Sequence, residues 1–138
     1  MVFIGLSLAA TVTCGGSSPS TPSTPSTPSL TGTWIGTETD TIAGTGNLQS
    51  TISQSGSTLS GTYSLSFPNP MFSNGGTVSG TVNGSTVSIT ATPSNPAICP
   101  ALDTATLNAA ANQITGTYAA VSGCNLTHQT GTFIATKQ

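Results

Sequence analysis

Few side chains of this sequence could perform chemistry. Among 138 residues, only Glu38, Asp40, Asp103 and Lys137 carry a formal charge, and His128 is the single histidine. Glu38 and Asp40 flank the end of one predicted strand, and paired carboxyl groups can perform acid–base catalysis or bind calcium. Two carboxyl groups are too few for a calcium cage, so a solvated loop is the favoured interpretation of this pair.

Catalytic residues are not identified in this sequence. A Ser-His-Asp set would have to use His128 with Asp103, and no GxSxG nucleophile elbow is present. A lone histidine beside a turn is typical of a surface position. The cysteines and the histidine lack the spacing of a zinc site, and no glycine-rich phosphate loop precedes a predicted helix. We therefore expect a protein that is not an enzyme and has no metal and no cofactor.

Composition narrows the class of fold and of partner. Charged residues make up 3% of the chain and the net charge is -2, so the basic surface that nucleic-acid binding requires is missing. Serine, threonine and glycine take the place of the charges. Serine and threonine are poor helix formers, whereas threonine fits a pleated sheet. No stretch of ten residues shows a helical period, which predicts an all-β protein.

The N-terminal residues 1–14, MVFIGLSLAATVTC, contain an apolar segment that ends near Cys14. This segment is too short to span a bilayer and is typical of a secretory signal. Cys14 with the following Gly-Gly-Ser-Ser resembles the maturation site of bacterial lipoproteins. The resemblance implies a lipidated Cys14 and a protein anchored in the bacterial cell envelope, at the outer membrane or cell surface. A cleaved secretory signal with an incidental Cys14 is the alternative, and it implies a secreted or periplasmic protein.

Residues 15–29 are predicted to form a linker. Proline recurs at every third position, at Pro19, Pro22, Pro25 and Pro28. This spacing favours an extended polyproline-like spacer, which could hold a domain about 30–45 Å from its anchor. A disordered segment with no anchoring role is the alternative.

Residues 30–138 are predicted to form one β domain, because apolar and polar side chains alternate along them. In TLSGTYSLSF, every second residue from Leu59 to Phe67 is apolar or glycine, and the others are serine or threonine. Asn83-Gly84 is a strong hairpin signal. Eight strands are expected, within residues 30–34, 47–53, 58–67, 77–83, 85–91, 104–109, 113–121 and 129–137. Consecutive hairpins of this number predict an eight-stranded antiparallel up-and-down (meander) barrel, with a two-sheet β-sandwich as the alternative.

A Gly-Thr-aromatic step recurs along these strands. It begins at Gly32, Gly61, Gly116 and Gly131, and Gly80 occupies a similar step with valine in place of the aromatic residue. Each glycine falls on the predicted core face between two large side chains. Glycine weakens a strand unless the space is needed, either for sharp coiling of a small barrel or for a ring packed over bare backbone. We interpret these glycines as structural.

Cys99 and Cys124 remain once Cys14 is assigned to lipid, and in an exported protein we expect them to form a disulfide. Closing a loop of about 25 residues stabilises a fold by roughly 3–4 kcal/mol. The bridge would join the SNPAICPALD and SGCNLTH loops at one end of the barrel. Free thiols are the alternative.

The segments LTGTW and LSGTY are similar to the opening strands of the avidin and streptavidin family, and ITGTYAAV and GTFIATK resemble its last strands. That resemblance implies an eight-stranded meander barrel; lipocalin-like barrels share the shape. Tyr63 aligns with the family's ureido-contacting tyrosine. Gly36 stands where the family has an asparagine, and the family's nearby serine falls near Asp40. The family's later ligand-stacking tryptophans are missing from this chain, because Trp34 is its only tryptophan. The resemblance therefore supports the barrel and argues against biotin binding.

The predicted function is a non-catalytic envelope lipoprotein whose small barrel binds a small ligand or a protein partner, with the membrane contacted through the lipid anchor only. Trp34, Tyr63 and Tyr118 are expected at any cavity, since each combines a large apolar ring with one polar tip. The alternative for these rings is that they fill the core. The alternative function is a surface structural or adhesive module without a small ligand.

Overall fold

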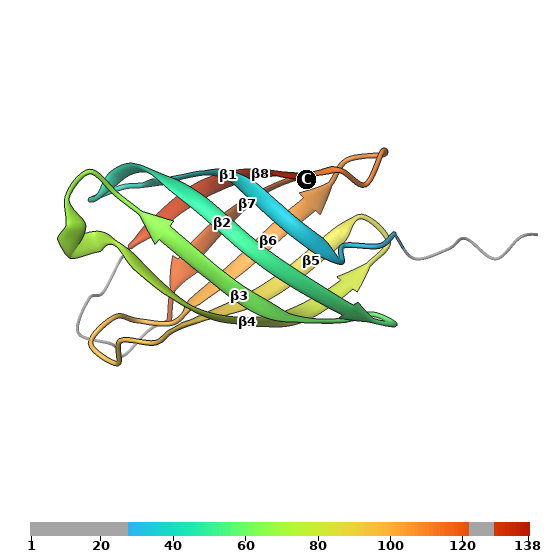
Figure 1. Ribbon diagram of the computed structural model, residues 1–138, viewed down its shortest axis with the longest axis horizontal. Coiled ribbons are helices and arrows are strands. Elements are labelled where there is room, and N and C mark those ends of the chain that lie inside the picture. Colours follow the sequence, from blue (N-terminus) through green and yellow to red (C-terminus); the bar gives the residue numbers. More distant parts are fainter. Residues whose placement is uncertain (1–27, 122–128) are drawn as a thin grey trace, which may run out of the picture.

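Eight antiparallel strands close into a barrel in the computed structural model, which describes residues 28–121 and 129–138 (Figure 1). Each strand pairs with the next along the chain, and β1 pairs with β8 to close the barrel. The predicted up-and-down barrel is confirmed, and the sandwich alternative is wrong. The strands are β1 (Gly32–Asp40), β2 (Gly44–Ser55), β3 (Thr58–Ser66), β4 (Asn74–Asn83), β5 (Thr86–Pro93), β6 (Ala101–Leu107), β7 (Gln113–Ala120) and β8 (Thr130–Lys137).

The connections differ at the two ends of the barrel (Figure 1). Short connections join β2 to β3, β4 to β5 and β6 to β7 at one end, which we call the turn end. The β4–β5 hairpin is the one predicted from Asn83-Gly84: Gly84 has φ +57°, a conformation that glycine adopts readily. At the opposite end, the loop end, the β3–β4 connection contains a 3₁₀ turn, η1 (Pro70–Phe72). Within the described residues, no helix is long and apolar enough to cross a membrane.

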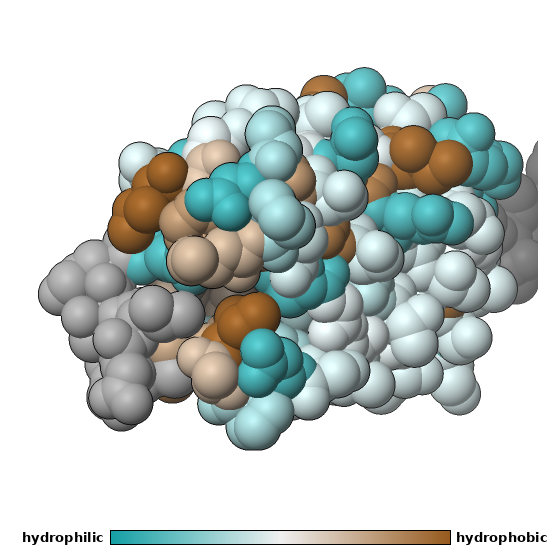
Figure 2. All heavy atoms as spheres, turned by 60° about the vertical axis from the view of Figure 1, so that its left-hand side comes forward, coloured by the Kyte–Doolittle hydropathy of each residue, from teal (hydrophilic) through white to brown (hydrophobic). Residues whose placement is uncertain are grey.

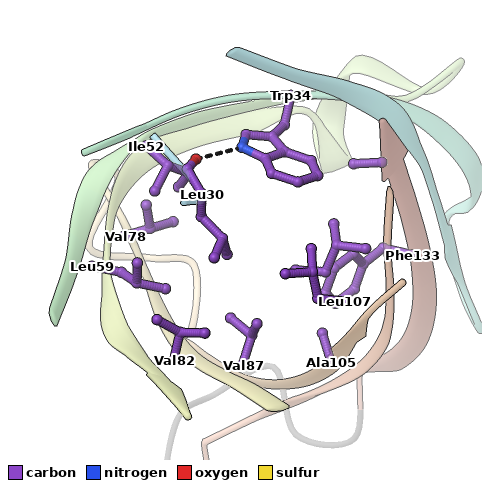
Figure 3. Close-up of a cluster of buried hydrophobic side chains, with 12 residues drawn as sticks. Leu30, Trp34, Ile52, Leu59, Val78, Val82, Val87, Ala105, Leu107 and Phe133 are labelled. Carbon is purple, nitrogen blue, oxygen red and sulfur yellow. Dashed lines mark hydrogen bonds between the residues drawn. The ribbon is translucent and has the colours of Figure 1, made fainter. Parts of the chain in front are cut away.

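A cluster of apolar side chains fills the turn end of the barrel (Figure 3). Val87, the second residue of β5, is 0% exposed. Burial of each large side chain in such a cluster contributes about 1.5–3 kcal/mol to folding. The members are Leu30, Trp34, Ile52, Leu59, Val78, Val82, Val87, Ala105, Leu107, Ile114, Phe133 and Ala135.

The segment that precedes β1 is held against the turn end by hydrogen bonds. The backbone N–H of Leu30 donates to Oε1 of Gln54 over 2.7 Å, and Nε2 of Gln54 donates to the carbonyl of Pro28 over 3.1 Å. The indole Nε1 of Trp34 donates to the carbonyl oxygen of Leu30 over 2.8 Å. The Leu30 side chain therefore points into the barrel and joins the core (Figure 3).

The Gly-Thr-aromatic steps of β7 and β8 pack against each other. Their register pairs Gly116 with Phe133 and Tyr118 with Gly131. A Cβ atom added to Gly116 would lie 2.8 Å from Cε1 of Phe133, and one added to Gly131 would lie 2.6 Å from Cε1 of Tyr118. Each ring therefore covers the glycine of the facing strand, and a larger residue would collide with it. The structural interpretation of these two glycines is confirmed.

Gly61 and Gly80 are required by a different contact. A Cβ atom at either position would overlap a backbone carbonyl oxygen of the neighbouring strand, that of Thr51 for Gly61 and that of Ser88 for Gly80. The strands approach this closely where the small barrel coils sharply. Gly32 differs from both, since it has φ +140° and lies against the Lys137 side chain.

We predict that Gly61→Ala destabilises the protein by about 1–3 kcal/mol, because the added methyl group must push two paired strands apart. Ser60→Ala is the matched control: Ser60 is the preceding residue of β3 and is exposed, so its replacement should change stability by no more than about 0.5 kcal/mol. Urea unfolding followed by Trp34 fluorescence measures both. Equal midpoints for Gly61→Ala and the parent protein would contradict the steric argument.

Candidate ligand-binding cavity

A cavity of about 140 Å³ occupies the barrel interior between the apolar cluster and the loop end. Side chains from all eight strands line it. An apolar protein cavity of about 150 Å³ can hold a benzene molecule, so this space suits a ligand of about one ring. The deepest residues at the turn end, Val82, Val87 and Leu107, do not line it. One half of the barrel is therefore packed and the other half is hollow.

The loop end forms the mouth of this cavity, which we define by Ala43, Phe67, Met71, Phe72 and Ile98. Figure 2 views the molecule with the loop end turned forward and shows apolar residues gathered there. Met71 of η1 is 79% exposed, which is unusual for a large apolar side chain. The mouth therefore presents an apolar surface to solvent.

All three aromatic residues expected at a cavity line this one. Trp34 is 3% exposed, belongs to the apolar cluster and forms part of the cavity floor, so it also fills the core. Tyr63 and Tyr118 are partly buried and lie nearer the mouth. The Tyr63 hydroxyl donates to Oδ1 of Asn74 over 2.8 Å, and the Tyr118 hydroxyl donates to Oδ2 of Asp40.

A row of paired residues crosses four strands at this level of the barrel. Asp103 of β6 pairs with Tyr118 of β7, Tyr118 with Gly131 of β8, and Gly131 with Asp40 of β1. Because Gly131 has no side chain, the Tyr118 ring lies over it and reaches the Asp40 carboxylate. The absence of a side chain at Gly131 thus allows the Tyr118 hydroxyl to reach Asp40.

Asp40 is fixed from its other side as well. Its Oδ1 accepts hydrogen bonds from the backbone N–H groups of Ile42 and Ala43, both over 2.7 Å, so the carboxylate closes the β1–β2 turn. Only 6% of the residue is exposed. Asp40 therefore links the mouth of the cavity to the hydroxyl of Tyr118.

The interpretation of Glu38 and Asp40 as part of a solvated loop is wrong. Strand β1 continues to Asp40, and both residues continue the inward set that contains Trp34. Asp103 also lies within a strand and faces the cavity, although the sequence suggested a position near the loops. The unbroken period of two from Trp34 to Asp40 was the signal that could have located the first pair.

Burial shifts the pKa values of Glu38 and Asp103. It raises the pKa of Glu38 to about 7; the nearby charge of Asp103 adds to this rise, and the hydrogen bond from Tyr118 opposes it. Burial likewise raises the pKa of Asp103 to about 7. It raises the pKa of Tyr63 to about 12 and also lifts that of Tyr118, whose hydrogen bond to Asp40 adds to the effect. Two carboxyl groups that titrate near neutrality therefore share the cavity with two protonated tyrosines.

The remaining predicted site residues are cysteines and the histidine. Cys99 is buried, 5% exposed, and lines the cavity. Cys14, Cys124 and His128 lie outside the described residues, so the Cys99–Cys124 bridge and the lipidation of Cys14 stay predictions. Among residues 28–121 and 129–138, no group of three or more histidine, cysteine or acidic residues is arranged to hold a metal ion.

Apolar walls with a few polar groups gathered in one region are typical of small-molecule pockets. The polar groups here include the carboxyls of Glu38, Asp40 and Asp103 and the hydroxyls of Tyr63 and Tyr118; Ser50, Asn74 and Gln129 also line the cavity. The arrangement can therefore enclose an apolar group and pair with a polar one.

Comparisons with known proteins identify the fold. No protein-family model and no curated protein matches the chain. Among solved structures, EF1p2_mFAP2b bound to DFHBI is 21% identical with a TM-score of 0.65, over 79% of this chain and 94% of that one. The redesigned β-barrel mFAP1 bound to DFHBI is 19% identical with a TM-score of 0.66, over 78% and 94%. A further redesigned β-barrel, b11L5F_LGL, is 19% identical with a TM-score of 0.61, over 79% and 91%.

We predict that thermal stability falls as the pH rises from 4 to 8. The folded pKa values of Glu38 and Asp103, about 7, exceed their ordinary values of 4.5 and 3.8. The folded state then binds more protons than the unfolded state between these limits, so its advantage is complete below pH 4 and is lost towards pH 7.

The Glu38→Gln/Asp103→Asn double variant provides the control for this pH dependence. It keeps the shape of the side chains without the titration, so its melting temperature should change less with pH and should exceed that of the parent at pH 8. Circular dichroism melts in steps of pH measure both proteins. Parallel curves for the two would show that these carboxyls do not cause the dependence.

Proposed function

We propose that this protein is a non-catalytic, small-ligand-binding barrel of the bacterial cell envelope, anchored through a lipidated Cys14 and spaced by residues 15–29. The observation that carries the proposal is the hollow half of the barrel. A well-packed interior leaves few voids larger than a water molecule, and an empty cavity costs stability. A space of about 140 Å³ that opens at the mouth and carries polar groups on its largely apolar walls supports the binding of a small ligand.

The residues around the cavity support this view. Several inward positions near the loop end carry small side chains, where larger apolar residues would have filled the barrel. They are Ala91, Ala101 and Ala120. An eight-stranded barrel can either be filled by its own side chains or hold one small ligand. Two barrels of the same fold, EF1p2_mFAP2b and mFAP1, are each bound to DFHBI, which illustrates the second case.

The position of the N-terminal segment supports the anchored arrangement. The chain enters the barrel at the turn end, where Leu30 joins the core, and the mouth lies at the opposite end (Figure 1). A barrel tethered through residues that precede Pro28 would therefore face its mouth away from the anchoring membrane. This orientation suits the capture of a ligand from the surrounding medium.

The proposal is tested by native mass spectrometry of the protein extracted gently from its own cells. We expect the native spectrum to contain an added mass that is lost on unfolding. A bare native mass would instead favour the alternative function, a surface structural or adhesive module without a small ligand. The denatured mass tests the anchor, because a lipoprotein gives a chain that begins at Cys14 with a diacylglycerol-sized addition.

A matched pair of variants locates the ligand. Ala120 lines the cavity, whereas its neighbour Ala119 is exposed on the outer face of β7. Ala120→Phe should remove the added mass by filling the space, and Ala119→Phe should retain it. Circular dichroism verifies that both variants keep the barrel. Retention of the ligand by folded Ala120→Phe would place the binding site elsewhere.

A further inference from the structure

We infer that the cavity selects a small organic amine, in which a protonated amino group is carried on an apolar body of about one ring. This inference rests on the proposed function and names the class of ligand for the same site. It follows from the charges that face the cavity, from the hydrogen-bonding capacity that these groups retain, and from the size and character of the walls.

All the charged side chains that line the cavity, among the described residues, are acidic. The three acidic residues of the whole chain, Glu38, Asp40 and Asp103, all line it. Lys137 is the only lysine or arginine in the chain, and its Nζ donates to the carbonyl of Ser29 over 3.0 Å at the turn end. All three acidic residues of the chain therefore lie in the cavity, and its one lysine lies outside it. Such a distribution attracts a cation and repels an anion.

The acids differ in how far their oxygens are already occupied. Both oxygens of Asp40 accept hydrogen bonds within the protein. The Tyr118 hydroxyl, which donates to Asp40, also lies near Glu38, and no hydrogen bond joins the Asp103 carboxyl group to any other described residue. Glu38 and Asp103 therefore retain acceptor capacity. An ammonium group has three N–H donors and no acceptor, and so matches a site that offers acceptors on two sides.

The rest of the cavity suits an apolar body. Leu48, Leu65 and Ile89 line its walls, and the rings of Tyr63 and Tyr118 lie in the same region as the carboxyl groups. Aromatic faces attract a desolvated cation in addition to their apolar contact. The volume of about 140 Å³ limits the occupant to a small molecule.

Protonation would couple to the binding of an amine. The groups that face Glu38 and Asp103 are Asp40 on β1, Tyr63 on β3 and Tyr118 on β7, and none of them is cationic. With pKa values of about 7, Glu38 and Asp103 are largely protonated at pH 5.5 and largely ionised at pH 8. A bound ammonium favours the ionised carboxylate, so amine affinity should rise with pH over this range.

Isothermal titration calorimetry of the full protein, purified after any native ligand has been removed by unfolding and refolding, tests this inference. Three probes of similar size differ in charge: 2-phenylethylamine, 2-phenylethanol and 3-phenylpropionate. At pH 8 we expect the amine to bind at least about tenfold more tightly than the alcohol, and the acid to bind most weakly. At pH 5.5 the advantage of the amine over the alcohol should shrink.

Asp103→Asn should abolish most of the amine's advantage over 2-phenylethanol, because it removes a carboxylate that pairs with the ammonium group, and Glu38→Gln should act in the same direction. Thr104→Asn is the matched control, because Thr104 is the next residue of β6 and is exposed on the outer face. Its probe affinities should equal those of the parent protein. A purely structural role of Asp103 would instead lower the affinity for amine and alcohol alike.

The outcomes separate the inference from the proposed function. Equal affinities for amine and alcohol, or tighter binding of the acid, overturn the amine inference and leave a ligand-binding barrel. Failure of all three probes to bind also overturns it, while the native mass of the protein from its own cells still decides whether the cavity holds a ligand.

Discussion

The reciprocal packing of two aromatic rings over two glycines, between β7 and β8, is the contact on which the two halves of the barrel depend. Phe133 covers Gly116 and belongs to the apolar cluster, whereas Tyr118 covers Gly131 and lines the cavity. Phe133 also lines the cavity, and Tyr118 packs against the apolar cluster, so this pair of strands contributes to both the core and the cavity. Because each ring occupies the space of the other strand's missing side chain, the register of β7 and β8 fixes both.

The three carboxyl groups of the cavity perform different tasks. Asp40 is fully engaged: it closes the β1–β2 turn at the mouth and holds the hydroxyl of Tyr118. Glu38 and Asp103 keep capacity for a further partner, and burial raises the pKa of each to about 7. Buried carboxyls of this kind weaken the fold at neutral pH, and strongly shifted groups in a cavity are typical of functional sites. The apolar cluster at the turn end offsets their cost.

Alternation along the sequence predicted the strands and the barrel well, because serine and threonine on one face contrast with apolar residues on the other. It also predicted that glycines would lie under rings or at close backbone approaches. It missed the acids of the cavity, since a charged residue after Trp34 suggested a loop, although Glu38 and Asp40 keep the same period of two. The residues that face each other on neighbouring strands depend on the strand register, and this register can pair residues that lie far apart in the sequence. The row from Asp103 through Tyr118 and Gly131 to Asp40 therefore has no local signal.

The same row of residues also connects the interior of the cavity with the β1–β2 turn at its mouth. Tyr118 lies between Asp103, its partner on β6, and Asp40 on β1, and Asp40 in turn holds the backbone of Ile42 and Ala43. A ligand group that enters between Glu38 and Asp103 would change the electrostatic field at a tyrosine whose hydroxyl is already committed to the turn. Asp40 is bound from both sides and holds the turn at the mouth, whereas the raised pKa values of Glu38 and Asp103 make the charge of the cavity depend on pH near neutrality.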